Sequence, residues 1–230
     1  MKILALDTST EWCSVAAGNG GEWHCRDELA VDSHSERALA LIDAVLGDAG
    51  WRLADLDGIA FGAGPGSFTG LRVGCGIAQG LALGADLPLA PVPTLLALAL
   101  AAGTAHGATR VVACLDARMR EVYVANVERG DAGWIETEPA RVLAPALVAP
   151  PPGTGWLGAG NGFAAYPELA RALALARVDA TARPTAQAIG ALAQPRLARG
   201  DGVAAADALP IYVRHRVALT AAERAAGKRL

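Results

Sequence analysis

The segment that most limits how this chain can fold is an apolar stretch with a glycine at nearly every helical turn. It begins at Gly64 and runs GPGSFTGLRVGCGIAQG. Each glycine inside a helix costs about 1 kcal/mol relative to alanine, although alanine is abundant elsewhere in the chain. The recurring glycines are Gly70, Gly74, Gly76, Gly80 and Gly84. Because this helix is apolar around most of its circumference, we predict that it is covered on more than one face.

Glycines spaced by four residues allow a neighbouring backbone to approach closely. One neighbour of the predicted helix 67–84 is a sheet of its own chain, and the other is a helix, a second domain or a second chain. Alternatively, the glycines only relieve crowding between this helix and its own sheet. The spacing alone leaves both interpretations open.

The first hundred residues follow the order βββαβαβα. A capping box of Ser33 and Glu36 is predicted to start the first helix. In such a box, each of the two side chains accepts a hydrogen bond from the backbone N–H of the other residue, which has no partner within the helix. The expected strands are Lys2–Asp7, Cys13–Ala17, Glu22–Arg26, Asp57–Gly62 and Leu89–Pro93, and the expected helices are 35–49, 67–84 and Thr94–Ala102.

A second unit begins near Thr109 and again places strands before helices. Its expected strands are Val111–Leu115, Val122–Val127, Trp134–Thr137, Trp156–Gly160 and Leu209–Arg214, with helices near Glu168–Arg177 and Thr185–Arg199 and a loop at 144–155. Two such units are typical of actin-like and sugar-kinase-like proteins. We therefore predict an α/β fold of two lobes, 1–102 and 103–216, each a mixed β-sheet flanked by helices, and a frayed or disordered tail at 217–230.

Composition excludes several classes of protein. A formal net charge of −3 does not suit a chain that binds a nucleic-acid backbone by itself. The four cysteines, Cys13, Cys25, Cys75 and Cys114, form no CxxC pair, so neither a zinc ribbon nor a thioredoxin-like site is indicated. The apolar runs are interrupted by Asp7 and by prolines, so no secretory signal or membrane span is expected. We expect a cytoplasmic protein with reduced thiols.

Two short segments have the chemistry of a nucleotide site. The loop Gly64–Pro65–Gly66–Ser67 precedes a helix, where backbone N–H groups can bind an anion. Asp7, Thr8 and Ser9 follow the first strand, where actin-like ATPases hold phosphate and metal. The chain has no GxxxxGK[ST] motif. The candidates for nucleotide binding are therefore Asp7, Thr8, Ser9, Gly64 and Gly66.

Five segments in this order resemble one known family: ILALDTST, HSER, GPGSFTGLRVG, LDARMREVYVA and PIYVR. They resemble the family of the bacterial tRNA threonylcarbamoyladenosine biosynthesis protein TsaB, also called YeaZ, over residues 3 to about 214. The resemblance implies an actin-like (ASKHA, ribonuclease H-like) fold and a non-catalytic subunit. It implies pairing with the catalytic paralogue TsaD and action together with the ATPase TsaE. That machinery places a threonylcarbamoyl group on the adenosine beside the anticodon of tRNAs that read codons starting with A.

The same resemblance implies how the chain meets its partners. Helices 35–49 and 67–84 correspond to the surface where two helices from each chain form a bundle, and the candidate residues are Arg37, Leu41, Val45, Arg72, Gly74, Ile77, Gly80 and Leu81. Arg72 suits a carboxylate of the partner, or it is a solvated charge on the flank. Leucine at Gly74 or Gly80 is expected to leave the chain folded and to abolish binding. No tightly bound cofactor is expected, with ATP or ADP at a shared interface as an open alternative. Binding of tRNA is expected only through the complex, and a homodimer can form when the partner is absent.

The motif DARMREVY has two interpretations. Asp116, Arg118 and Glu121 either line the cleft between the lobes or form a self-contained turn with local ion pairs, and we favour the turn. Tyr123 is expected in the core.

Two enzymatic functions remain as alternatives to the non-catalytic subunit. The first is an actin-like ATPase or small-molecule kinase that uses Asp7, and the second is a metallopeptidase. The histidines show no metal-ligand spacing, since Ala38 stands where a second ligand after His34 would be, and HExxH is absent. Ser67 does not lie in a GxSxG nucleophile motif.

Overall fold

The computed structural model describes residues 1–30 and 34–214. The expected capping residue Ser33, the isolated His215 and the expected tail 217–230 lie outside these residues. In chain order the strands and helices are β1 (Ile3–Asp7), β2 (Trp12–Gly18), β3 (Trp23–Leu29), α1 (His34–Ala49), β4 (Gly58–Gly64), α2 (Phe68–Ala85), β5 (Leu89–Pro93), α3 (Thr94–His106), β6 (Arg110–Asp116), β7 (Val122–Gly130), β8 (Gly133–Glu136), β9 (Arg141–Leu143), β10 (Leu157–Ala159), α4 (Gly162–Ala165), α5 (Glu168–Ala172), β11 (Arg177–Asp179) and α6 (Ala186–Ala198), with short 3₁₀ turns at Leu53–Asp55, Pro145–Leu147 and Ala205–Asp207.

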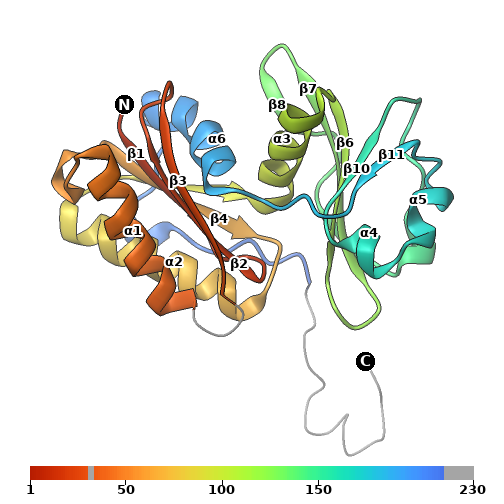
Figure 1. Cartoon of the computed structure of the whole chain (residues 1–230), viewed down its shortest axis with the longest axis horizontal. Helices are drawn as coiled ribbons and strands as arrows, with labels where there is room; N and C mark the ends of the chain where they lie inside the picture. The colour runs from red at the N-terminus through yellow and green to blue at the C-terminus, as the bar shows by residue number, and fades with distance from the viewer. Residues whose placement is uncertain (31–33, 215–230) are drawn as a thin grey trace, which may run out of the picture.

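The first lobe is built on a five-stranded sheet of order β3-β2-β1-β4-β5 (Figure 1). Strands β1, β2 and β3 form an antiparallel meander, while β4 and β5 continue the sheet parallel to β1. Register places Asp7 opposite Ser14 at the end of β1. The sheet is mixed, as expected, and its loops after β1 and β4 open at the same edge, because these two strands run in parallel.

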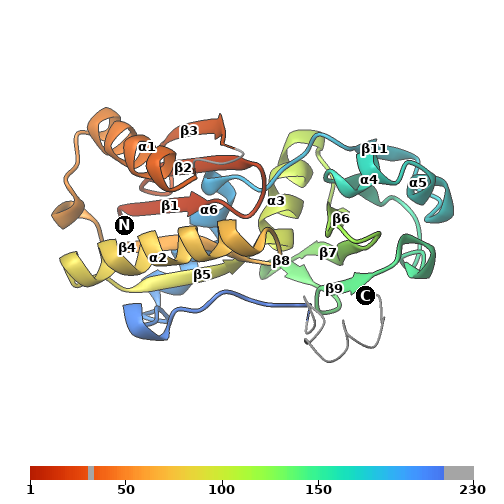
Figure 2. The same cartoon turned by 90° about the horizontal axis from the view of Figure 1, so that it is seen from below.

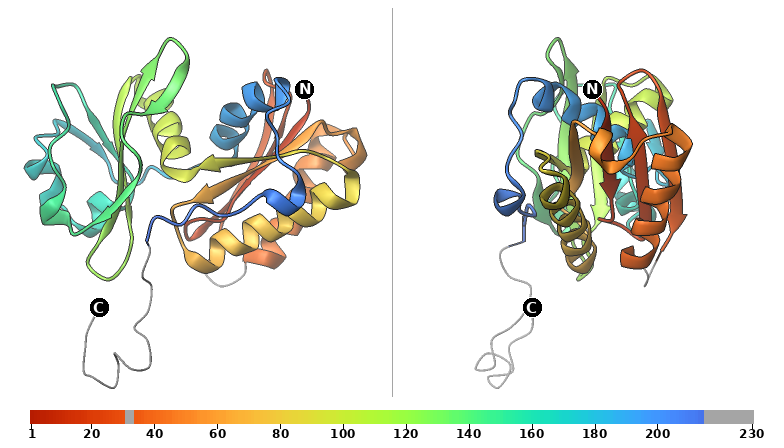
Figure 3. Two further views of the ribbon diagram at one scale, coloured as in Figure 1. Left: turned by 180° about the vertical axis from the view of Figure 1, so that it is seen from behind. Right: turned by 90° about the vertical axis from the view of Figure 1, so that its left-hand side faces the viewer.

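Helices cover both faces of this first sheet. Side chains alternate along β1, so Leu4 and Leu6 pack with α1 and α2 on one face. Ile3 and Ala5 pack with α6 and part of α3 on the other face. Figure 3 shows α1 and α2 together on one side of the sheet and α6 on the opposite side.

The second lobe is a six-stranded sheet of order β11-β10-β6-β7-β8, with β9 also paired to β7. Its residues Val111, Ala113 and Leu115 face α3, and its opposite face packs against α4 and α5. The two mixed sheets with flanking helices confirm the predicted actin-like, ribonuclease H-like architecture.

Helix α3 is apolar on both sides because it lies between the two sheets. Leu95, Leu98 and Ala102 pack on the second sheet, whereas Ala97 packs into the core of the first lobe. This double burial accounts for the apolar composition of α3. Within residues 1–30 and 34–214, no helix is long and apolar enough to cross a membrane.

The sequence predicted most elements and missed several short ones. The glycine-rich helix was expected at 67–84 and spans Phe68–Ala85, with Ser67 as its N-cap, whose hydroxyl accepts a hydrogen bond from Gly70 N at 3.3 Å. The strands β9 and β11 and the helix α4 were not predicted, and the helix expected near 168–177 ends at Ala172. The final strand expected at 209–214 is wrong, because that segment is extended but joins no strand ladder.

The expected extent of the second lobe, 103–216, differs from the packing seen in the structure. The end of the chain does not belong to the second lobe alone, since α6 packs on the first sheet through Ile189 and Ala193. Residues 203–214, which we call the strap, then run along α2 and β5 (Figure 2). The first lobe is therefore assembled from both ends of the described chain, with the second lobe inserted between them.

Candidate functional site

The glycines of α2 fall into two groups that face different neighbours. Gly70 and Gly74 are buried against Thr8, which follows β1. A methyl group added at Gly70 would overlap the Thr8 carbonyl oxygen, and one added at Gly74 would overlap the Thr8 hydroxyl. That hydroxyl donates a hydrogen bond to Gly70 O at 2.7 Å. These two glycines therefore make room for the chain's own strand end.

The second group of glycines faces outward. Gly76, Gly80 and Gly84 are exposed, and a methyl group added at any of them would meet no heavy atom within 4 Å. No packing among the described residues explains why alanine is absent at these positions. Leu83 extends the same face and is 78% exposed. We call the exposed residues Gly76, Gly80, Leu83 and Gly84 the open face of α2.

Helix α1 lies beside α2 and presents a similar exposed surface. Leu39, at 50% exposure, and the small residues Ala40, Ala44 and Gly47 are exposed on α1. Arg37 is exposed as well, and its guanidinium lies 3.7 Å from the carboxylate of Glu28 on β3. The exposed surface of α1 therefore combines these small and apolar residues with the charged residues Glu36, Arg37, Asp43 and Asp48.

Three predicted docking residues are not on this surface. Leu41 and Val45 are buried in the core between α1 and the first sheet, and Gly74 is buried against Thr8. They cannot meet a partner without unpacking the lobe, so they are removed from the candidate surface, and leucine at Gly74 is no longer expected to leave the chain folded. Ile77 and Leu81 are half-buried and pack against the same core. Gly80, Arg72 and Arg37 remain exposed.

Arg72 belongs to a small aromatic cluster. Its guanidinium carbon lies 3.9 Å from the ring centroid of Phe68, one helical turn earlier. Its Nε donates a hydrogen bond to the Tyr212 hydroxyl at 3.2 Å, and the two rings are 5.9 Å apart. No carboxylate of the described residues lies within ion-pair distance of Arg72. The Arg72 guanidinium is therefore held by contacts with two aromatic side chains and has no acidic partner among the described residues.

The sequence analysis missed Phe68 and Tyr212. Phe68 stands four residues before Arg72 on a helix, and this spacing is a sufficient signal for a side-chain pair. Tyr212 is 140 residues away in sequence, so only the folded path of the strap brings it to the cluster.

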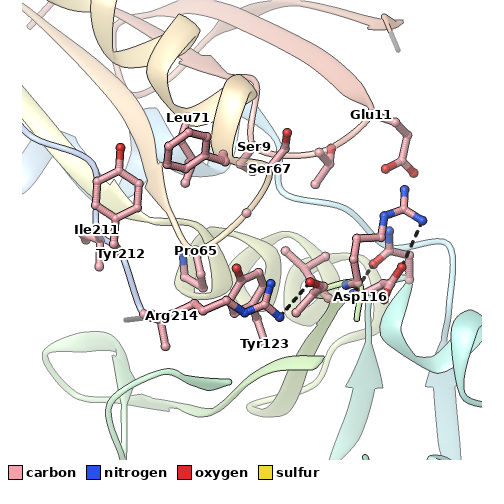
Figure 4. Close-up of a pocket in the computed structure, with 18 of the residues that line it drawn as sticks. Ser9, Glu11, Pro65, Ser67, Leu71, Asp116, Tyr123, Ile211, Tyr212 and Arg214 are labelled. Carbon is pink, nitrogen blue, oxygen red and sulfur yellow. Dashed lines mark hydrogen bonds and ion pairs between the residues drawn. The ribbon is translucent and has the colours of Figure 1, made fainter. Parts of the chain in front are cut away.

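A cleft of about 600 Å³ separates the two lobes (Figure 4). Its first-lobe wall includes Ser9, Ser67 and Leu71, and its second-lobe wall includes Asp116 and Tyr123. The strap closes one side with Ile211, Tyr212, Val213 and Arg214. A cavity of this size suits a small ligand, although its walls mix apolar and oppositely charged side chains.

The candidate nucleotide residues are mostly sealed away from this cleft. Asp7 and Thr8 are 1% exposed and do not line it. Gly64 lies beneath the strap, since a methyl group added there would stand 2.6 Å from Ile211 O. Ser9 and Gly66 do line the cleft, but the Ser9 carbonyl already accepts a hydrogen bond from Ser67 N at 2.7 Å. Asp7 therefore cannot reach a metal or phosphate in the cleft in this arrangement.

Asp7 is an unusual carboxylate because only one of its oxygens has a partner. Oδ1 accepts hydrogen bonds from Ser9 N at 3.1 Å and from Ser9 Oγ at 2.8 Å. Oδ2 has no hydrogen-bond partner and is pressed against Gly62. Complete burial raises the pKa of Asp7 from 3.8 to about 6, because the charged form loses its hydration, and the bonds from Ser9 oppose this only in part.

The DARMREVY motif forms both a turn and a wall of the cleft. Arg118, Met119 and Arg120 all have positive φ angles of 54 to 61°, a run that is costly for residues with side chains. Within the turn, Arg118 Nη1 lies 3.3 Å from the Asp116 carboxylate. Asp116, Arg118 and Tyr123 also line the cleft, and Tyr123 is buried. The motif therefore forms a turn with a local ion pair and also lines the cleft between the lobes.

Comparison with known proteins now identifies the family. Residues 27–221 match the family model described as TsaD, tRNA N6-adenosine threonylcarbamoyltransferase. The chain is 42% identical over 223 residues to the tRNA threonylcarbamoyladenosine biosynthesis protein TsaB of Escherichia coli, covering 95% of this chain and 96% of that protein. It is also 42% identical over 226 residues to TsaB of Haemophilus influenzae, covering 94% and 95%. The chain belongs to the TsaB (YeaZ) family.

Solved structures agree with this assignment. YeaZ from Pseudomonas aeruginosa superposes with a TM-score of 0.85 at 39% identity, covering 92% of this chain and 99% of that one. A second structure from the same organism, described as similar to peptidase YeaZ, gives a TM-score of 0.87 at 40% identity over 93% and 99% of the two chains. The two-lobed fold of this TsaB-family chain thus matches those solved structures over nearly its whole length.

No metal-ligand cluster occurs among residues 1–30 and 34–214 of this TsaB-family chain. His34 Nε2 donates to Thr10 O at 2.9 Å, and His106 Nε2 is 2.8 Å from Asp179 Oδ2. The Asp179 pKa is lowered by its hydrogen bond to His106. These histidines therefore serve internal contacts, and the described residues offer no support for the metallopeptidase alternative.

Cys13 and Cys114 are fully buried. Burial raises the pKa of both Cys13 and Cys114 to about 12, so both thiols stay protonated near neutral pH. All four cysteines are free, as expected from their scattered positions.

Proposed function

We propose that this chain takes part in tRNA threonylcarbamoyladenosine biosynthesis as a non-catalytic subunit that binds the catalytic subunit TsaD. The family supports the pathway, and the open face of α2 is the observation that carries the docking role. Gly76, Gly80 and Gly84 carry a helix cost of about 1 kcal/mol each, and no described residue of this chain needs the space that they leave. A partner helix packed closely across α1 and α2 accounts for that cost.

Arg72 gives the docking surface a charged element. Its guanidinium is fixed by Phe68 and Tyr212 and has no acidic partner among the described residues. We propose that it pairs with a carboxylate of TsaD, because a pre-positioned guanidinium loses little conformational entropy on binding. The surrounding surface is apolar, which would strengthen such an ion pair when the interface closes.

The burial of Asp7 removes the main support for an independent ATPase or kinase. Such an enzyme needs acidic groups that reach the metal-bound phosphates, whereas Asp7 is 1% exposed and is pressed against Gly62 on the face of the first sheet that α6 covers. We propose that any ATP or ADP binds at an interface shared with TsaD or TsaE and that TsaE supplies the ATPase activity. The purified chain alone is expected to show no ATP hydrolysis above background, and hydrolysis that Asp7→Ala abolished would contradict this.

The docking role is tested by substitution at Gly80. Gly80→Leu places a branched side chain on the open face of α2, and overpacking of an interface costs about 1–3 kcal/mol. We expect TsaD to bind this variant about tenfold more weakly or worse, measured by calorimetric titration, with unchanged circular dichroism. Ala105→Leu is the control, because Ala105 is exposed on α3 away from this surface. Native affinity in Gly80→Leu would show that TsaD does not use this face.

We propose that tRNA reaches this subunit only as part of the complex. The chain carries 20 basic against 23 acidic residues, and phosphate contacts dominate affinity for nucleic acid. Alone, it is expected to bind tRNA weakly in a filter-binding assay at physiological salt. A tight complex whose affinity fell steeply with salt would contradict this.

The same open face suits a homodimer when TsaD is absent, since exposed apolar surface favours association. Light scattering of the purified chain should then show a dimer that Gly80→Leu dissociates. A stable dimer unaffected by that substitution would place the homodimer contact elsewhere.

A further inference from the structure

The strap, residues 203–214, connects α2 with the second lobe. Figure 3 shows it running along α2 before it turns toward the second lobe. At its start, Val203 and Leu89 exchange backbone hydrogen bonds of 2.8 and 2.9 Å. Its end reaches the DARMREVY turn. One short segment therefore spans β5, α2, the cleft and the second sheet.

The middle of the strap is fixed to the helix that carries the open face. The Ala208 carbonyl accepts hydrogen bonds from Gln79 Nε2 at 2.9 Å and from Cys75 Sγ at 3.4 Å. Ala208 itself is fully buried among the α2 core residues. Ile211 N then donates to Ala63 O at the end of β4, at 2.7 Å. Tyr212 accepts the hydrogen bond from Arg72, so the strap supplies one wall of the aromatic cluster.

The last described residue of the strap clasps the second lobe. Arg214 Nη2 lies 2.5 Å from Glu121 Oε2 and donates to Ala117 O at 3.0 Å. Its guanidinium carbon is 5.7 Å from the ring centroid of Tyr123, and its side chain is only 13% exposed. The Glu121 side chain is 37% exposed, so the pair is half-buried and is screened less by solvent than a fully exposed pair. Breaking it leaves an uncompensated charge in a covered site.

We propose that the Arg214–Glu121 clasp positions the docking surface, so that loosening it at the second lobe weakens TsaD binding at α2. The clasp fixes the end of the strap, two residues after Tyr212. Tyr212 in turn fixes the guanidinium of Arg72, which we assign to the partner carboxylate. A loose strap lets Tyr212 move, and the cluster then has to be ordered again when TsaD binds. The proposal rests on the proposed function, and it makes Arg214 and Glu121 positioning residues rather than contacts.

A double-mutant cycle on the full chain tests this, with purified TsaD as the probe. Arg214→Ala and Glu121→Ala should each weaken TsaD binding about fivefold or more, which is the usual range of coupling between sites. Both substitutions remove the same Arg214–Glu121 ion pair. The affinity of the double variant for TsaD should therefore be no lower than that of the single variant with the lower affinity. Arg199→Ala is the control, since it removes only an exposed ion pair with Asp201 beyond α6.

Restoring the Arg214–Glu121 ion pair by a second substitution distinguishes a positioning role of this pair from a general effect on stability. The charge exchange Arg214→Glu with Glu121→Arg should recover most of the lost affinity, whereas each of its single changes should not. Arg214→Lys should retain part of it, because the contacts of Arg214 with Glu121 and with Ala117 O are both made from Nη2, and only the weak contact with Met119 Sδ comes from Nη1. If the thermal unfolding temperature falls but TsaD affinity stays native, the clasp is structural only and the proposal is overturned. It is also overturned if the exchanged pair binds as weakly as Arg214→Ala. In either case Gly80→Leu independently reports whether α2 is the docking helix.

Discussion

Gly70→Ala is expected to destabilise this chain by about 3 kcal/mol or more, while Gly76→Ala, two turns along the same helix, stabilises it by about 0.5–1 kcal/mol. At Gly70 the new methyl group overlaps the Thr8 carbonyl oxygen, so β1 or α2 has to shift. At Gly76 it meets nothing, and only the helix preference for alanine is felt. Urea denaturation of the three proteins measures the two free-energy changes directly.

Gly74→Ala gives an intermediate point in this series. Its methyl group overlaps the Thr8 hydroxyl, a side chain that can rotate at the cost of its hydrogen bond to Gly70 O. We therefore expect a loss smaller than at Gly70. Equal effects of alanine at Gly70 and Gly76 would mean that α2 is free to move away from β1, and the division of its glycines into two groups would be wrong.

Asp7→Asn is expected to stabilise the chain at neutral pH and to have no such effect in acid. The raised pKa means that the folded state holds the Asp7 proton more tightly than the unfolded state, where the pKa is near 3.8. Folding is therefore unpenalised below pH 3.8 and loses stability as the pH rises through about 6. A shift from 3.8 to about 6 corresponds to about 3 kcal/mol, at about 1.4 kcal/mol per pH unit.

The difference in unfolding free energy between Asp7→Asn and the parent chain should thus grow by about 2.5 kcal/mol between pH 4 and pH 7.5. Asn retains the oxygen that accepts the hydrogen bonds from Ser9 and carries no charge. Asp179→Asn is a control of opposite sign, because the lowered pKa of Asp179 stabilises the fold above its ordinary range. That variant should lose stability at neutral pH, and its deficit should shrink as the pH falls. A flat difference for Asp7→Asn across this range would mean that Asp7 keeps its ordinary pKa.

The sequence predicted the long elements and their order, because their signals are local. The helical period of α1 and α2 and the apolar runs of β1 and β4 depend on neighbours a few residues away. Short elements such as β9 and β11, of three residues each, depend on strands far along the chain and carry no period. The return of α6 to the first sheet could not be predicted either, since its packing against Ile3 and Ala5 depends on tertiary contacts and not on local sequence.

The candidate site was predicted in part for the same reason. Glycine spacing indicated a surface of close approach, but it could not show that Gly74 faces Thr8 while Gly80 faces solvent. Leu41 and Val45 have the spacing of the apolar face of a helix, and the lobe's own sheet covers both residues. Asp7 occupies a position typical of phosphate sites, yet only the packing of β4 and α6 around it shows that the carboxylate is enclosed.

The return of α6 and the strap to the first lobe has a consequence for how this chain matures. During synthesis, the first sheet emerges before α6 can cover one of its faces, because Ile189 is made more than a hundred residues after Ile3. Contacts of such long sequence separation form slowly. The surface that we propose as the TsaD docking site therefore reaches its final shape only after nearly all of the chain has left the ribosome, which ties readiness for assembly to completion of the polypeptide.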